Sequence, residues 1–149
     1  MPCNDVTEII RIQLDRDERF KSYRLSKRTC GGAVGAASLI EDYFRGRTPD
    51  EIVQMTPEAF HAAWLAPTEI EEFLALKHFF AVQIALEVLT GRAPGGVKDP
   101  CIVAAVGYNG DEMYFEAEIP IDLPTEKIRA CGLCKRCPSI RVPGKTRTT

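Results

Sequence analysis

The first part of the chain alternates hydrophobic and polar residues in the manner of half-buried strands. Within residues 8–26, Ile10, Ile12 and Leu14 alternate with polar side chains, and a polar turn separates them from a second run of the same kind. An alternation with a period of two places one set of side chains on a buried face and the other in solvent. The sequence therefore predicts an antiparallel hairpin over residues 8–26.

The pattern then changes to the spacing of amphipathic helices. Residues 36–44 place apolar side chains on one helical face. Thr48 and Thr56 are each followed by proline, which predicts the starts of two short helices because threonine caps a helix and proline suits its first turn. A longer helix is predicted to start at Thr68 and to end near Thr90.

A segment rich in proline and glycine, residues 93–97, separates these helices from a second region with β character. Residues 102–108 and 113–121 flank Asn109-Gly110, which is a strong hairpin-turn signal. We therefore expect three parts: a core domain of residues 1–92, a linker of residues 93–97 and a C-terminal unit of residues 98–149.

Composition narrows the functional classes. The 149 residues are 45% hydrophobic and 27% charged with a net charge of −2, which is ordinary for a folded domain and argues against a protein whose whole surface binds nucleic acid. No apolar run approaches the roughly 18 residues of a membrane span, and the start lacks the pattern of a secretory signal. We therefore expect a cytoplasmic protein, in which six cysteines favour metal, cluster or sulfur chemistry over disulfides.

The densest cysteine motif lies near the C-terminus, where Cys131, Cys134 and Cys137 are each separated by two residues. This spacing turns thiolates toward one centre, and tetrahedral zinc or an iron–sulfur cluster normally takes four ligands. Cys101, near the start of the same predicted unit, is the simplest candidate for the fourth ligand. Structural zinc, an iron–sulfur cluster and redox or sulfur-carrying thiols all remain open for this motif, which is followed by a basic tail.

Four other residues are candidates from their positions. Cys30, beside two glycines, basic residues and a predicted helix start, is placed to form a thiolate, although a tight turn also suits it. Cys3 and Asp5 lie two apart, so an extended backbone points both side chains the same way. His78 lies among apolar neighbours, where a packed core residue and a metal ligand are both open.

These features occur in a characteristic order along residues 2–92. The segments are Pro2-Cys3-Asn4-Asp5-Val6, Thr29-Cys30-Gly31-Gly32-Ala33, Ala37-Ser38-Leu39-Ile40-Glu41-Asp42-Tyr43 and Leu76-Lys77-His78-Phe79. Together they resemble the IscU-type iron–sulfur cluster assembly scaffolds, which are equivalent to the N-terminal domain of NifU. Phe79 stands where that family has its third cysteine, and residues 98–149 have no counterpart in the basic scaffold.

The resemblance implies an α+β fold in which a small antiparallel sheet packs on helices. It also implies a site that gathers Cys3, Asp5, Cys30 and His78, a ligand set suited to zinc, iron or a labile cluster. His78 would bind through one ring nitrogen and would need a hydrogen-bond partner for the other.

The leading hypothesis is a divergent scaffold that binds a metal or iron–sulfur cluster and passes iron or sulfur to a partner protein. Cys30 would accept sulfur from a cysteine desulfurase or another donor, Cys3 and His78 would hold the metal, and Asp5 would be an exchangeable ligand. The alternatives are a sulfur-carrier adaptor whose basic tail contacts RNA, and a structural zinc protein that serves in interactions. The absence of a recognisable nucleophile–base pair argues against a conventional enzyme.

Overall fold

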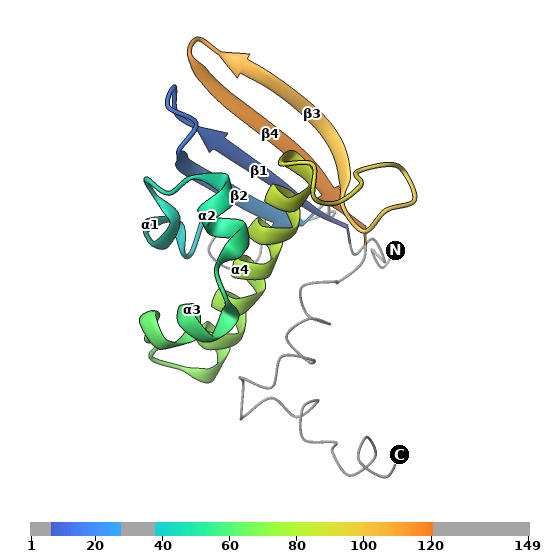
Figure 1. The fold of residues 1–149 in the computed structure, drawn as a ribbon. Coiled ribbons are helices and arrows are strands. Elements are labelled where there is room, and N and C mark those ends of the chain that lie inside the picture. The colour runs from blue at the N-terminus through green and yellow to red at the C-terminus, as the bar shows by residue number, and fades with distance from the viewer. Residues whose placement is uncertain (1–6, 28–37, 121–149) are drawn as a thin grey trace.

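The computed structural model describes residues 7–27 and 38–120 of the chain. Within them, two strands precede four helices and two strands follow (Figure 1). The elements are β1 (Glu8–Leu14), β2 (Phe20–Lys27), α1 (Glu41–Phe44), α2 (Pro49–Gln54), α3 (Pro57–Ala63), α4 (Glu69–Leu89), β3 (Ile102–Asn109) and β4 (Glu112–Ile119). The strands form an antiparallel sheet in the order β2-β1-β4-β3, which confirms the predicted α+β class.

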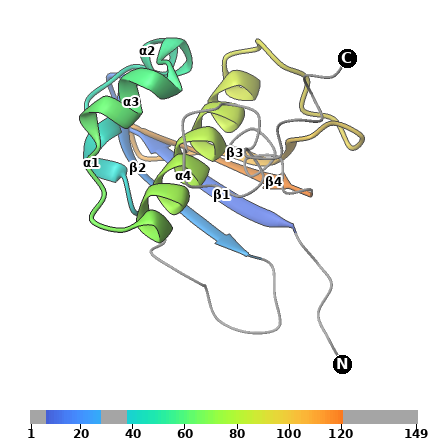
Figure 2. The ribbon, with the colours of Figure 1, turned by 90° about the horizontal axis from the view of Figure 1, so that it is seen from below.

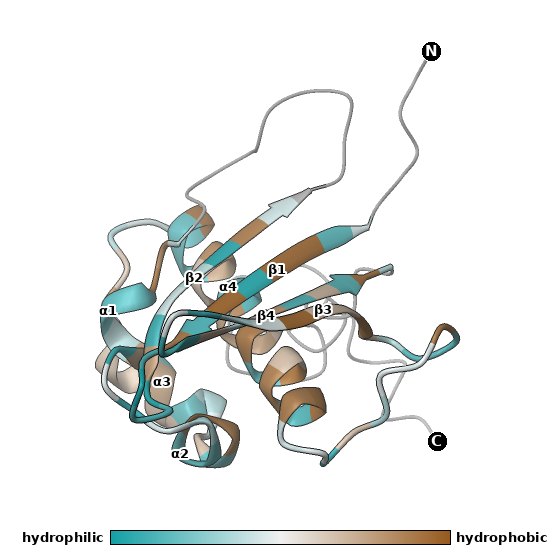
Figure 3. Ribbon diagram, turned by 90° about the horizontal axis from the view of Figure 1, so that it is seen from above, coloured by the Kyte–Doolittle hydropathy of each residue, from teal (hydrophilic) through white to brown (hydrophobic). Residues whose placement is uncertain are grey.

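The predicted N-terminal hairpin is present, and its alternation decides which side of the sheet is buried. β1 pairs with β2, and Ile10, Ile12 and Leu14 are 0%, 0% and 3% exposed. Figure 2 shows the helices gathered on one face of the sheet, with α4 running beneath the strands. The alternation of hydrophobic and hydrophilic residues along β1 is visible in Figure 3.

The second hairpin belongs to this same sheet. β3 and β4 pair on either side of Gly110, and β4 also pairs with β1 over its whole length, from Glu8 opposite Ile119 to Leu14 opposite Met113. Residues 102–119, expected in a separate C-terminal unit, thus complete the sheet begun by residues 8–27. The physical reason is that an isolated two-stranded hairpin is barely stable, whereas β1 offers a second edge for pairing. Residues 121–149 lie outside the described part of the chain.

The predicted helix caps are confirmed. The Thr48 hydroxyl accepts a hydrogen bond from the backbone N–H of Glu51, and the Glu51 carboxylate accepts one from the Thr48 N–H. The hydroxyls of Thr56 and Thr68 likewise accept from a backbone N–H in the first turns of α3 and α4. The described helix near residue 40 spans only Glu41–Phe44, and residues 28–37 lie outside the description. Within the described ranges, no helix is both long and apolar enough to cross a membrane.

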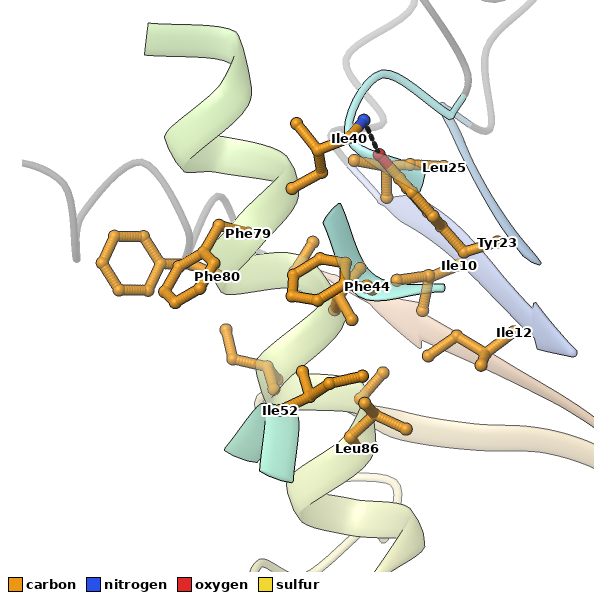
Figure 4. Packing of buried hydrophobic residues seen from close by; sticks show 14 of the residues in the cluster. Ile10, Ile12, Tyr23, Leu25, Ile40, Phe44, Ile52, Phe79, Phe80 and Leu86 are labelled. Atoms are coloured by element: carbon orange, nitrogen blue, oxygen red, sulfur yellow. Dashed lines mark hydrogen bonds between the residues drawn. The ribbon is translucent and has the colours of Figure 1, made fainter. Parts of the chain in front are cut away.

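An aromatic cluster joins α4 to the short helices. Phe79 is 0% exposed, and its ring stacks on Phe60 with centroids 4.7 Å apart and on Phe44 with centroids 6.0 Å apart. Figure 4 shows Phe79 and Phe44 among the buried side chains that pack around α4. The Phe79 side chain is therefore part of the hydrophobic core.

Candidate functional site

One end of each of the four strands lies at the same end of the sheet. At this end, which we call the cysteine end, Glu8 of β1 is paired with Lys27 of β2 on one side and with Ile119 of β4 on the other. Ile102, the first residue of β3, pairs with Glu118 beside them. Adjacent strands lie about 4.8 Å apart, so the four strand ends fall within about 15 Å of one another.

Three of the sequence-predicted cysteines are only a few residues away in sequence from this end of the sheet. Cys3 precedes Glu8 by five residues, Cys30 follows Lys27 by three, and Cys101 comes directly before Ile102. The motif that starts at Cys131 follows the end of β4. Of the candidate ligands only Cys101 and His78 are described. The others, namely Cys3, Asp5, Cys30, Cys131, Cys134 and Cys137, lie outside the described residues.

The His78 side chain is held by a chain of two hydrogen bonds that starts at the backbone N–H of Ile40. The backbone N–H of Ile40 donates to the Tyr23 hydroxyl at 3.1 Å, and the Tyr23 oxygen lies 2.6 Å from His78 Nδ1 (Figure 4 draws the first of these bonds). Tyr23 comes from β2 and His78 from α4, and both side chains are buried. In the sequence, residues 28–37, which contain Cys30, connect Lys27 to Ser38, two residues before the Ile40 amide that Tyr23 binds.

The burial of this pair sets its protonation. Burial lowers the pKa of His78 to about 4, and the Lys77 ammonium adds to this effect. Burial likewise raises the pKa of Tyr23 far above its ordinary value. The Tyr23 oxygen accepts from Ile40 and its O–H can donate to Nδ1, an arrangement in which the proton of the neutral ring is on Nε2.

A neutral imidazole with one nitrogen already bonded satisfies both interpretations that the sequence left open. As a core residue, His78 has its Nδ1 partnered by Tyr23. As a metal ligand, it would bind through Nε2 once that proton moves to Nδ1, and Tyr23 would become the acceptor that holds the ring in place. Tyr23 is thus the hydrogen-bond partner that the ligand hypothesis requires.

Lys77, the sequence neighbour of His78, forms a buried ion pair that was not predicted. Lys77 Nζ is 2.5 Å from Glu8 Oε1, and the Glu8 side chain is only 5% exposed. Glu8 Oε2 is buried without a hydrogen-bond partner among the described residues. The signal was present in the sequence, since Glu8 occupies the position of the β1 alternation that continues Ile10 and Ile12 onto the buried face.

Cys101 packs as a core residue. It is 1% exposed, and burial raises the pKa of its thiol to about 11, with the Glu87 carboxylate adding to the effect. Its thiol is therefore protonated at neutral pH, and a metal would have to displace that proton. Within residues 7–27 and 38–120, no three His, Cys, Asp or Glu side chains come together as a metal site.

The lowered pKa of His78 predicts a loss of stability in acid. The unfolded chain takes up this proton near pH 6.5 and the folded chain only near pH 4, so the contribution is full above pH 6.5 and is lost as the pH falls toward 4. The loss amounts to about 3 kcal/mol across this window. Urea unfolding of the wild type and of His78→Gln at pH 7, 5.5 and 4.5 measures it, because the difference between the two proteins isolates the histidine. Parallel curves for the two proteins would refute this account.

The Glu8–Lys77 pair predicts non-additive effects on the free energy of unfolding. Lys77→Met leaves a buried carboxylate without its cation and is expected to cost about 3–5 kcal/mol. The double variant Glu8→Leu/Lys77→Met removes both charges and completes the apolar row of β1, so it is expected to recover most of that loss. Chemical denaturation of both variants checks this. A Lys77→Met cost below about 1 kcal/mol would show that the pair is effectively solvated.

Comparison with known proteins does not add a family: no family model, no curated protein and no solved structure matches this chain.

Proposed function

We propose that this protein is a metal- or cluster-binding scaffold that receives sulfur or iron from a donor protein and passes it to an acceptor. Its core centre is formed by Cys3, Asp5, Cys30 and His78, as the resemblance to the IscU-type scaffolds implies. The C-terminal motif Cys131, Cys134 and Cys137 forms a second centre, for which Cys101 is the candidate fourth ligand. The cargo is zinc, iron or an iron–sulfur cluster.

The observation that carries this proposal is the convergence at the cysteine end. Three residues span at most about 11 Å and five at most about 18 Å, which limits how far Cys30 lies from Lys27 and Cys3 from Glu8. Because Lys27 and Glu8 are paired neighbours, these spans are long enough for the two cysteines to meet, which supports the proposal. Lys77, which bonds Glu8, is the sequence neighbour of His78, whose own bond is to Tyr23, the partner of Ile12 in β1.

The state of His78 also supports a ligand role. Its pKa of about 4 keeps the ring neutral at physiological pH, and a neutral nitrogen is the form that binds metal. Tyr23 holds the other nitrogen, in the manner of the outer hydrogen bonds that orient metal-binding histidines. A ligand set of two thiolates, an imidazole and a carboxylate suits zinc or iron, and the weaker carboxylate favours release as well as capture.

Cys30 is the proposed sulfur acceptor. Its thiolate would attack the outer sulfur of a donor persulfide, so that a new S–S bond forms on Cys30 while the donor cysteine leaves as a thiolate. The donor is a cysteine desulfurase or another protein persulfide. In this role the protein is a carrier and not a conventional enzyme.

Metal and acid-labile sulfide analysis after anaerobic purification tests the proposal. The wild type is expected to retain zinc or iron, with sulfide and visible absorbance if a cluster is bound. Cys30→Ala is expected to lose the species held by the core centre and to retain that of the C-terminal centre. Cys134→Ala is the matched control, because it changes one thiol of the other motif and is expected to show the reverse.

Two results would contradict the proposal. Unchanged metal and sulfide content in Cys30→Ala would mean that no core centre depends on this thiol. Zinc held without sulfide, together with the absence of a persulfide on Cys30 after incubation with a persulfide donor, would leave a structural zinc protein as the better description.

A further inference from the structure

The two outer strands of the sheet differ in how they are protected. β2 exposes the charged side chains Lys21 and Arg24 along its length. β3, which reads Ile-Val-Ala-Ala-Val-Gly-Tyr-Asn, contains neither a charged residue nor a proline. Charges and prolines on an edge strand prevent it from pairing with another chain, so β3 lacks the usual protection.

β3 also exposes apolar side chains on the helix-facing side of the sheet. Val106 is 50% exposed and Tyr108 is 72% exposed, whereas Phe115, the strand neighbour of Val106 in β4, is 1% exposed. Residues directly opposite in an antiparallel pair point to the same side. The buried face therefore ends at β4, and its apolar row continues uncovered onto β3.

Only the beginning of this edge is occupied by another part of the described chain. The N–H of Val103 donates to the carbonyl oxygen of Gly95 at 3.1 Å, and a Cβ on Gly95 would come within 2.7 Å of Val103, so the preceding loop packs tightly there. Beyond this point, β3 is the last strand in the order of the sheet formed by the described residues. Within residues 7–27 and 38–120, no other segment pairs with the edge from Ala104 to Asn109, which is thus the part that a second chain could pair with.

We propose that β3 pairs antiparallel with β3 of a second copy of this chain about a twofold axis near Val106 and Gly107. A twofold axis sets a strand antiparallel to its own copy, so the hydrogen-bonding edges complement each other without a second surface. The uncharged sequence places no like charges opposite one another. The same pairing through β2 would oppose cationic strands, which disfavours the other edge.

The pair joins two four-stranded sheets into one and brings the exposed Val106 and Tyr108 of each copy beside those of its partner. A single strand pair lies at the small end of specific interfaces, so the dimer is expected to dissociate with a Kd on the order of 10–100 µM. This inference does not depend on the proposed metal chemistry, since it uses only the described edge.

Sedimentation velocity of the full chain from about 5 µM to about 500 µM, with chelator and reductant present, tests the dimer. The wild type is expected to shift from monomer to dimer over this range. Val106→Lys places two ammonium groups near the axis and is expected to weaken the dimer at least tenfold. Ser26→Lys adds the same charge to β2 and is the matched control, which is expected to leave the dimer unchanged.

Amide hydrogen exchange of the wild type keeps the proposal testable even if a variant fails to fold. Amides of Ala104–Asn109 are expected to gain protection with rising protein concentration, while those of β2 do not. A monomer at every concentration would overturn the proposal. So would β3 protection that is independent of concentration, because another segment of the same chain would then cover this edge.

Discussion

The pairing of β1 on both of its edges is the constraint on which the rest of this structure depends. β1 pairs with β2, its neighbour in sequence, and with β4, which follows all four helices in the sequence. One face of β1 is then filled by Ile10, Ile12 and Leu14, which require cover from α4. Burial of these side chains fixes the register, since a slip by one residue would turn them to solvent.

The same register determines what meets at the cysteine end. With Ile10 and Ile12 directed inward, Glu8 must also point inward, where it is stabilised by Lys77 of α4. The ion pair sets one turn of α4 against the start of β1, and the next residue, His78, is bound by Tyr23 of β2. The buried polar contacts of this region are therefore made by residues that hold the helix to the sheet.

The features that sequence predicts best are local ones. The alternation of Ile10, Ile12 and Leu14 and the caps at Thr48, Thr56 and Thr68 are encoded within a few neighbouring residues, and the structure confirms both. The β1–β4 pairing was not predicted because it joins distant parts of the chain, and nothing within residues 102–119 specifies which edge they meet. For the same reason, the linker predicted at residues 93–97 separated the β3–β4 hairpin from the strand with which it pairs.

The candidate site was predictable only in part. The hydrophobic surroundings of His78 indicated its burial, but its bond to Tyr23 depends on how β2 lies against α4. Cys101 was assigned as a metal ligand only because the C-terminal motif needs a fourth one. That argument contains no information on burial, and the structure places the Cys101 thiol in the core. Phe79 is explained by packing, because its ring stacks with Phe44 and Phe60.

The central claim is that a mixed-ligand metal centre forms at the cysteine end. X-ray absorption at the zinc edge tests it most directly in a zinc-loaded full chain in which Cys131, Cys134 and Cys137 are changed to serine. The account predicts bound zinc with two sulfur ligands at about 2.3 Å and nitrogen or oxygen ligands at about 2.0–2.1 Å. A protein that binds no zinc, or zinc without sulfur ligands, would contradict it.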